Sequence, residues 1–262
     1  MKFRKNIFLE VSKQKFSSVE FSKHVIFNKV YNIDNENTYY KDVTNVKDFQ
    51  INIRNKNLYV LVEGETVYIR LVTLPKVKKY LVNDMIKNEL RYYYKDIDHI
   101  SFTYKLIKED KTNMEILVFC LKGNNLDILE NSVHNNVKLK KVNLIQFCFK
   151  NFYSSKINEK NYIMVFYYNN NLYYLICNNN EIVANNSVGI EEVFLSKFSK
   201  SMNEFLEQYN YYAKACEKIY YSNISQLDIE SDIKEFKYLE LPHKILDELK
   251  REDLLKYIIL KG

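Results

Sequence analysis

The stretch from Tyr162 to Ile190 limits the possible fold more than any other part of the sequence. It reads YIMVFYYNNNLYYLICNNNEIVANNSVGI, three apolar runs separated by clusters of asparagine. Short runs rich in β-branched and aromatic residues, bounded by turn-forming residues, are typical of strands. The pattern therefore predicts a three-stranded meander. Its first turn contains neither glycine nor aspartate, the residues that a phosphate-binding hairpin would need.

Glycine is scarce throughout the chain, with 4 Gly and 2 Pro among 262 residues, so glycine-rich phosphate loops are disfavoured by composition alone. A hydrophobic fraction of 47% and a charged fraction of 27% indicate a soluble globular protein of one large domain or two small lobes. Lys, Asn, Ile and Tyr are abundant, as low-GC codon usage would produce. We therefore give the net charge of +6 little weight as a sign of function.

The four cysteines lie far apart, without a CxxC pair: Cys120, Cys148, Cys177 and Cys216. Buried free thiols in a reducing compartment explain them better than zinc or a disulfide framework. The apolar run of the N-terminus, MKFRKNIFLEV, stops at Glu10 and is too short for a signal peptide. No stretch approaches the length of a spanning helix, so we expect a soluble cytoplasmic chain.

The first half of the chain combines strand patterns with one clear helix. Strands are predicted at 7–11, 17–21, 25–31, 58–62 and 67–74. From Val77 to Tyr94 the apolar residues recur at helical spacing. Strands at 100–107 and 114–121, a helix ending near His134 and a strand at 137–144 then complete a compact α+β block. Glu63-Gly64-Glu65 reads as an exposed hairpin turn and not as a catalytic pair.

The second half repeats the order of a meander, a helix and a strand. A helical segment at 145–153 precedes the meander, a long helix is predicted from Ile190 to about Ala215, and a strand at 218–221. One or two helices are predicted within 242–257. Two similar halves follow from this order, the first with an inserted subdomain.

The chain resembles the PilM family of type IV pilus assembly proteins, within the actin-like ATPase superfamily, and the related cytoplasmic domain of GspL. The resemblance rests on VYIRLVTLPKVKKYLVNDMIKNELRYYYKDIDHISFTYKLI, a strand ending in Leu-Pro, an amphipathic helix and a strand, followed by EILVFCLKGNNLDILENSVHNNVKLKKVNL. It implies an α/β, actin-like (ribonuclease H-like) fold of two lobes. Residues 1–66 and about 145–158 would form lobe one, 67–144 an inserted α+β subdomain, and 159–262 a reduced lobe two without the family's second insertion.

The nucleotide-binding elements that the resemblance implies are degenerate. In the first phosphate hairpin Glu10 stands at the aspartate position and Ser12 at the glycine position. In the second, Tyr167 replaces the carboxylate and Asn169 follows it closely; the later glycine pair is Ser222-Asn223. Bulky tyrosine obstructs the close approach of backbone N–H groups to phosphate, and Mg²⁺ is usually held through carboxylates. We therefore expect no cofactor, although Glu10 leaves Mg·ATP binding open.

The other residues that could form a metal site, a catalytic site or a nucleic-acid-binding surface have a simpler structural interpretation. The four histidines show no i, i+4 pairing, Asp96-Ile97-Asp98-His99 reads as a solvated connection, and no nucleophile elbow is visible. We expect no metal site, no catalytic residues and no enzyme. Lys76–Lys79 and Lys138–Lys141 are basic, but lysines at element starts are normally solvent cover, so we expect no nucleic-acid binding. The same charges are compatible with weak attraction to anionic lipid.

The resemblance also implies partners. PilM-like proteins bind the short cytoplasmic N-terminal tail of PilN, a bitopic membrane protein, in a groove that involves lobe one and its insertion. Carried onto this chain, the core or the wall of that groove would contain Leu74, Val82, Ile86, Leu90 and Tyr93. The expected function is a scaffold at the inner face of the cell membrane that links such a tail to the assembly ATPase of a pilus or secretion machine. The alternative is a switch that binds Mg·ATP and regulates partner affinity.

Overall fold

The computed structural model describes residues 5–12, 15–24, 29–40, 43–63, 67–94, 97, 100–122, 136–191, 198–225, 227 and 230–261. The chain forms two compact units. The first contains Met1–Thr66, Asn124–Ile157 and Leu249–Gly262, and the second contains Val67–Gly123 and Asn158–Glu248. Each unit is described by itself.

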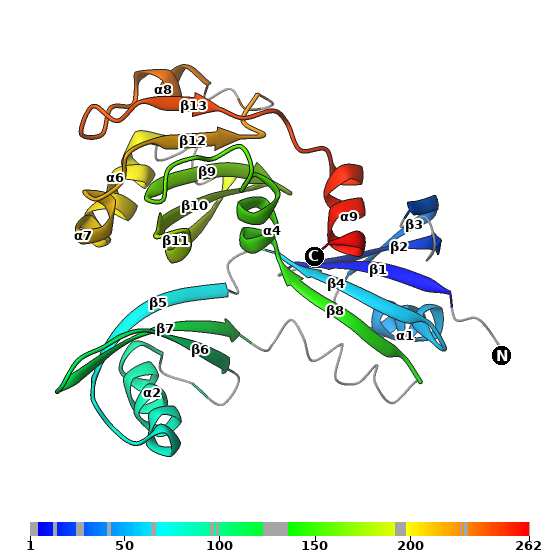
Figure 1. Ribbon diagram of the computed structural model, residues 1–262. Coiled ribbons are helices and arrows are strands. Elements are labelled where there is room, and N and C mark those ends of the chain that lie inside the picture. The colour runs from blue at the N-terminus through cyan, green and yellow to red at the C-terminus, as the bar shows by residue number, and fades with distance from the viewer. Residues whose placement is uncertain are drawn as a thin grey trace. The chain divides into compact units, whose positions relative to one another are not determined.

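The first unit is built on a five-stranded sheet (Figure 1). In spatial order its strands are β3 (Lys29–Tyr40), β2 (Lys15–His24), β1 (Asn6–Val11), β4 (Asn57–Val62) and β8 (Lys138–Leu144). The three strands β3, β2 and β1 are antiparallel, whereas β1, β4 and β8 run parallel. Strands β1 and β4 are buried along nearly their whole length, as central parallel strands are.

Helices cover both faces of this sheet. Because side chains alternate along a strand, Phe16 and Ser17 of β2 point to opposite faces. Phe16 packs on Phe49 of α1 (Val43–Ile53), with ring centroids 4.6 Å apart. Ser17 lies on the face of α9 (Arg251–Leu260), whose Arg251 reaches it. Helix α4 (Ile145–Phe152) follows β8 and contacts α9 through Phe152 and Tyr257.

The larger sheet of the second unit has the same order of connections. Its strands are β11 (Glu181–Gly189), β10 (Asn171–Asn178), β9 (Tyr162–Tyr168), β12 (Ile219–Ser222) and β13 (His243–Ile245). Three antiparallel strands are again followed by parallel ones. One core joins the sheet to α6 (Phe198–Gln208) and α8 (Glu230–Glu235), with the short α7 (Asn210–Ala213) after α6. The two sheets support the prediction of two similar halves.

A three-stranded antiparallel sheet completes the second unit, in the order β5 (Val67–Pro75), β7 (Asn113–Lys122) and β6 (Ile100–Glu109). Helix α2 (Lys79–Tyr93) packs on one face of it. On the other side of β5, the backbone N–H of Ile69 donates to Asn185 Oδ1 of β11 at 2.9 Å. This small sheet with α2 corresponds to residues 67–122 of the α+β subdomain expected at 67–144.

The asparagine turns of the meander adopt the conformation that their residue type allows. Asn169 and Asn170 join β9 to β10, Asn179 and Asn180 join β10 to β11, and all four have positive φ, between 45° and 62°. Asparagine tolerates this left-handed region better than most residues, and two such residues in succession make a tight hairpin turn. The predicted meander is therefore confirmed, with asparagine in the role that glycine often fills.

Two assignments at the edges of the sheets were wrong. Strand β8 was placed in the inserted subdomain, but it pairs with β4 and extends the first sheet. One or two helices were predicted within 242–257; α9, which begins at Arg251, confirms one, but His243–Ile245 form β13, which pairs with β12. Both errors concern pairing partners far away in sequence, which a local pattern does not encode. The predicted domain boundaries at 144 and 159–262 shift accordingly, because α9 belongs to the first unit.

The helices differ from expectation in smaller ways. The helix predicted from Ile190 to Ala215 is divided near Tyr209 into α6 and α7, while residues 192–197 lie outside the described part. Helices α1 and α8 were not predicted. The predicted helix ending near His134 and the segment Asp96–His99, apart from Ile97, also lie outside the described residues.

All four cysteines are buried thiols outside any disulfide, as predicted. Burial raises the pKa of the Cys120 thiol to about 11 and that of Cys148 to about 12. Thiols with such values stay protonated at neutral pH and are poor nucleophiles and metal ligands. Their role in the fold is that of small apolar side chains.

A partly buried ion pair near the start of β9 makes the stability of the second unit dependent on pH. Lys218 Nζ lies 2.7 Å from Glu159 Oε1, and Tyr220 donates its hydroxyl to the same carboxylate. Burial alone would raise the pKa of Glu159, but these hydrogen bonds outweigh it and lower the pKa from 4.5 to about 2.

We expect Glu159→Gln to remove part of the acid sensitivity of the chain. A carboxyl whose pKa is depressed by folding adds stability above its unfolded pKa, and this contribution disappears as the pH falls, here between about 4.5 and about 2. The difference in urea midpoint between wild type and Glu159→Gln should therefore shrink across that window. The exposed Glu204, 4.0 Å from Lys200, provides the control, because Glu204→Gln should leave the profile unchanged. A constant difference from pH 7 to pH 2 would contradict the assignment.

Candidate functional site

Buried polar residues gather where the parallel strands of the first sheet end. Glu10 lies near the end of β1, Glu63 directly follows β4, and Gln146 is the second residue of α4, directly after β8. All three are among the few buried polar residues of the described chain. In open sheets with parallel strands, ligands bind beyond the carboxyl ends of those strands. This end of the sheet is the candidate site.

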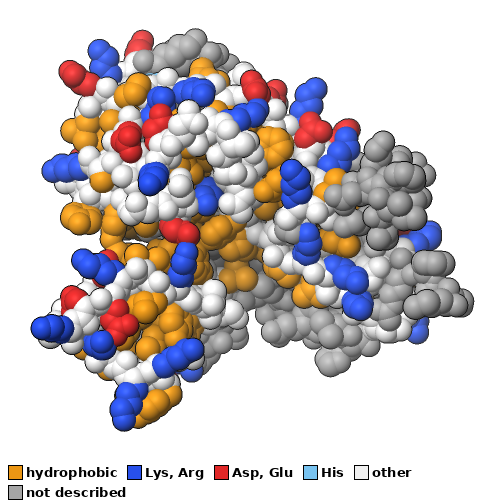
Figure 2. Space-filling model, viewed as in Figure 1, with side chains coloured by type: hydrophobic (Ala, Val, Ile, Leu, Met, Phe, Trp, Pro, Cys, Tyr) orange, Lys and Arg blue, Asp and Glu red, His pale blue; other side chains and the backbone are white. Residues whose placement is uncertain are grey.

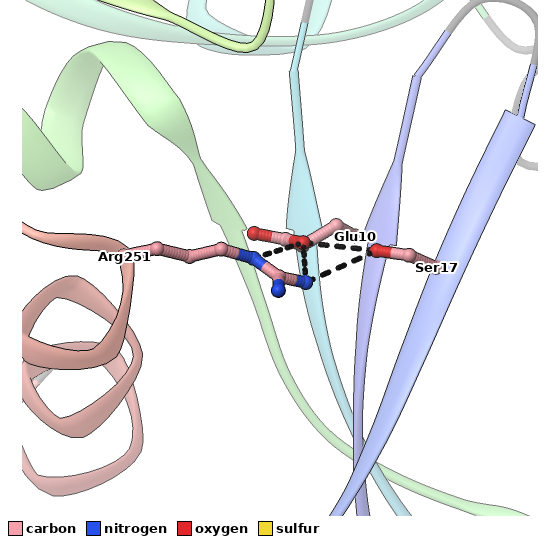
Figure 3. A network of polar contacts seen from close by, with 3 residues as sticks. All are labelled: Glu10, Ser17 and Arg251. Atoms are coloured by element: carbon pink, nitrogen blue, oxygen red, sulfur yellow. Dashed lines mark hydrogen bonds and ion pairs between the residues drawn. The ribbon is translucent and has the colours of Figure 1, made fainter. Parts of the chain in front are cut away.

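Glu10 is bonded from two directions inside the unit (Figure 3). Its Oε2 accepts hydrogen bonds from Ser17 Oγ at 2.9 Å, from Arg251 Nε at 3.0 Å and from Arg251 Nη2 at 2.5 Å. The Glu10 side chain is only 4% exposed, while that of Arg251 is 34% exposed. Arg251 begins α9, so the network joins the first strand of the chain to a helix 241 residues later. Nothing in the local sequence marked Arg251 as a partner of Glu10.

Glu63 and Gln146 were not recognised from the sequence. Glu63 was interpreted as an exposed turn residue, but it is buried, and its backbone N–H donates to the Val11 carbonyl at 3.0 Å. Gln146 is fully buried, and neither its amide nitrogen nor its amide oxygen has a hydrogen-bond partner among the described residues. An unpaired buried amide is costly, so Gln146 is a feature that the packing of the core does not explain.

The remaining predicted nucleotide residues fall in both units. Ser12 follows β1 in the first unit and is half-buried. Asn169 and Asn223 follow β9 and β12 of the second unit, and these strands are parallel neighbours, so both residues lie at the same end of that sheet. Their φ values are 45° and 56°, which keeps the backbone conformation typical of glycine. Both turns are closed locally by side chains: Tyr167 donates to Asn170, and Ser222 donates to Asn223.

A magnesium-bound nucleotide would need a carboxylate and several free backbone N–H groups. In this arrangement one oxygen of the Glu10 carboxylate, Oε2, already accepts three hydrogen bonds, two of them from a guanidinium. Among the described residues, no group of three or more His, Cys, Asp and Glu side chains could hold a metal ion. The residues present are therefore a poor fit to a metal-bound triphosphate.

The predicted partner-binding residues separate into core and surface. Leu74, Val82, Ile86 and Leu90 are buried in the core of the three-stranded sheet and α2. Their role is to hold α2 in place, not to contact a partner directly. Tyr93 differs, because it is 42% exposed and the Arg70 guanidinium lies 3.7 Å from the centre of its ring. Tyr68, also partly exposed, contacts Tyr94 at a tilt, with ring centroids 5.4 Å apart.

We call Tyr68, Arg70 and Tyr93 the Tyr93 surface. Tyrosine and arginine are the residues most often found at energetic hot spots of protein interfaces, because both combine a large apolar area with a polar tip. A cation held over an aromatic ring is also pre-ordered, which reduces the entropy lost on binding. The Tyr93 surface can therefore serve as a contact for another chain.

The second unit also contains an open groove of about 1010 Å³. It is lined by residues of β5, β6 and β7, of α7 and the segment after it, and of the β10–β11 hairpin, among them Leu71, Ile107, Tyr211 and Glu181. Lys105 lies 2.7 Å from Glu181 at this groove. None of the residues predicted from the sequence as binding residues line it.

Comparison with solved structures finds matches over nearly the whole chain. The PilM–PilN type IV pilus biogenesis complex matches with a TM-score of 0.63 and 9% identity, over 97% of this chain and 96% of that chain. The cytoplasmic domain of EpsL, an inner membrane component of the type II secretion system of Vibrio cholerae, matches with a TM-score of 0.58 and 10% identity, over 98% and 95%. A Bacteroides thetaiotaomicron protein described as having an actin-like ATPase fold matches with a TM-score of 0.54 and 9% identity, over 97% and 95%.

The chain has the actin-like fold. This confirms the fold class predicted from the sequence, with PilM and the EpsL cytoplasmic domain among its structural neighbours. At identities near 10% the likeness concerns the fold. No protein-family model matches the sequence, and no curated protein matches it.

Among the described residues, no helix combines the length and the apolar character that crossing a membrane requires.

Proposed function

We propose that this chain is a scaffold component of a type IV pilus or type II secretion-like assembly machine, at the cytoplasmic face of the cell membrane. The observation that carries the proposal is the end-to-end match to PilM in the PilM–PilN complex, supported by the similar match to the EpsL cytoplasmic domain. The chain would bind the cytoplasmic N-terminal tail of a PilN-like bitopic membrane protein and link it to the assembly ATPase. It would act by docking, without catalytic turnover.

The hydrogen bonds that Glu10 accepts support a scaffold without a functional nucleotide-binding site. Binding a metal there would require breaking the hydrogen bonds from Arg251 and Ser17, and would leave a guanidinium partly buried without its partner. Tyr167, at the other carboxylate position, directs its hydroxyl to Asn170 within its own turn. Both positions are thus used to stabilise the fold.

The Tyr93 surface is the proposed contact for the tail. It belongs to the subdomain that the resemblance implicates, and it is the exposed part of the predicted set. A peptide tail of a few residues gains most of its affinity from one or two anchors.

Tail binding is tested by titrating the purified chain with a synthetic peptide. The peptide should correspond to the N-terminal tail of the single-pass membrane protein encoded beside this chain's gene, with calorimetry as the readout. We expect Tyr93→Ala to weaken the Kd by roughly tenfold or more, because it removes an anchor and leaves Arg70 without its ring. Tyr211→Ala on α7, another exposed tyrosine, should leave the Kd unchanged. Equal Kd values for the wild type and Tyr93→Ala would rule out the Tyr93 surface.

The alternative function is a switch that binds Mg·ATP and changes partner affinity. The unpaired amide of Gln146 is the observation that favours it, because a ligand at the end of the first sheet could supply the missing hydrogen bonds.

Thermal unfolding with and without Mg·ATP separates the two functions. A ligand at about 100 times its Kd stabilises by roughly 2.7 kcal/mol, which is a shift of several degrees in Tm for a chain of this size. We expect no shift. A shift of several degrees would favour the switch, and Glu10→Ala should then also weaken tail binding. In the scaffold, Glu10→Ala should leave tail binding unchanged at temperatures where the variant stays folded.

A further inference from the structure

Helix α2 exposes large apolar side chains on the side away from its core. Val82, Ile86 and Leu90 form its buried face. Yet Tyr80 is 71% exposed, Leu81 38% and Tyr92 86%. Leu81 and Tyr92 are eleven residues apart, close to three full turns, so they lie on the same side of the helix, and Tyr80 is next to Leu81. We call Tyr80, Leu81 and Tyr92 the outer face of α2. On the part of the molecule that holds α2, Figure 2 shows hydrophobic side chains with Lys and Arg, and some Asp and Glu, around them.

Cations surround this outer face. Between positions 78 and 93 the chain has four of them, Lys78, Lys79, Lys87 and Arg91, against two carboxylates, Asp84 and Glu89. All four cations are exposed. Arg91 Nη1 donates to Asn88 Oδ1 at 3.0 Å. Because asparagine is neutral, this contact does not neutralise the charge of Arg91. The segment therefore has a net charge of +2 next to three exposed apolar side chains.

We propose that the outer face of α2 contacts the anionic headgroups of a lipid bilayer directly. Tyrosine concentrates at membrane interfaces because its ring is apolar and its hydroxyl is polar. Lysine and arginine can extend along an apolar surface and keep their charge among the headgroups, where anionic lipid attracts them. A single exposed helix side projects its residues outward instead of lining a groove. That geometry suits a flat interface better than an extended peptide or a nucleic-acid strand.

This inference goes beyond the proposed function, in which the chain reaches the membrane through its partner. It also does not require the tail. The outer face and the Tyr93 surface share no residue; the Tyr92 and Tyr93 rings are in contact, with centroids 5.5 Å apart, but Lys87 and Arg91 belong to neither surface. The two can therefore fail separately. Asp84 lies among the cations and weakens the attraction, which gives the proposal a variant with increased binding as well as variants with decreased binding.

Vesicle sedimentation without the tail peptide tests the proposal. The full chain is mixed with vesicles of phosphatidylcholine containing about 30% phosphatidylglycerol, or of phosphatidylcholine alone, at about 0.1 M salt. We expect binding to the anionic vesicles only, weakened by added salt. Lys87→Glu with Arg91→Glu should reduce the partition coefficient by roughly tenfold or more, Tyr80→Ser with Tyr92→Ser should also reduce it, and Asp84→Asn should increase it several-fold.

Lys200→Glu with Lys214→Glu is the matched control. It makes the same change in net charge on exposed residues of the second unit outside α2, so it should retain most of the binding. The proposal is overturned if the control loses as much binding as the α2 variant, because net charge alone would then be responsible. It is also overturned if the wild type does not bind anionic vesicles, or if the outer-face variants lose tail binding and not vesicle binding. Tail titration without vesicles reports on the proposed function independently.

Discussion

Replacing Arg251 with alanine should destabilise the first unit by roughly 2 to 4 kcal/mol. The substitution leaves the Glu10 carboxylate in a nearly fully buried position with Ser17 as a donor but without its cation, and breaking a buried pair from one side is strongly unfavourable. The estimate is kept below the range for fully buried pairs because a third of Arg251 is exposed. Amide hydrogen exchange is the suitable measurement, because it reports on β1 of the first unit and β10 of the second separately.

Two further variants identify the cause of the loss. Lys256→Ala on the same helix removes an exposed cation 3.8 Å from Asp253, and should cost about 0.5 kcal/mol or less. Glu10→Gln combined with Arg251→Met removes both charges, and should recover much of the stability lost in Arg251→Ala. If Arg251→Ala costs no more than Lys256→Ala, the ion pair does not stabilise the unit.

Replacing Ile86 with alanine should destabilise the subdomain of α2 by roughly 3 kcal/mol. Ile86 is fully buried among the side chains of the three-stranded sheet, so the change removes apolar contacts and leaves a cavity. Hydrogen exchange of the β7 amides, measured at increasing urea concentration, would give this loss of stability. Leu81→Ala on the same helix should cost far less, because Leu81 is 38% exposed and lies outside the core that contains Ile86.

The same variant separates a core role from a binding role. At a temperature where the Ile86→Ala subdomain remains folded, its Kd for the tail peptide should equal that of the wild type, because Ile86 does not reach the surface. Tyr93→Ala should behave in the opposite way, with a weaker Kd and nearly unchanged stability. A direct loss of affinity in Ile86→Ala at unchanged stability would contradict the assignment of this residue to the core.

The sequence was most informative where local chemistry decides the structure. The meander was predictable because apolar runs end at paired asparagines, and those asparagines adopt positive φ in the structure. The face of α2 was predictable because Val82, Ile86 and Leu90 recur at helical spacing and become buried. In each case neighbouring residues contain the information.

Long-range pairing was not predictable in the same way. Strand β8 has the sequence KLKKVNL and extends the first sheet beside β4. Its three lysines are not typical of a strand within a buried sheet, so the sequence did not indicate this pairing. The contact of Arg251 with Glu10 joins two segments that each look ordinary, a helix start and a strand. Gln146 and Glu63 follow strands whose parallel alignment brings them to one end of the sheet, and that alignment is a property of the whole unit.

The separation of Glu10 and Arg251 in the sequence also affects the order in which the chain folds during translation. Glu10 leaves the ribosome 241 residues before Arg251, which at translation rates of 5 to 20 residues per second is roughly 12 to 48 s. During that interval β1 and β2 can pair locally, but the Glu10 carboxylate near the end of β1 has no guanidinium to bind. Such non-local closure slows folding, whereas the meander of β9, β10 and β11 needs only neighbouring residues. The unit whose strands are synthesised first therefore receives its last element, α9, only at the end of the described chain.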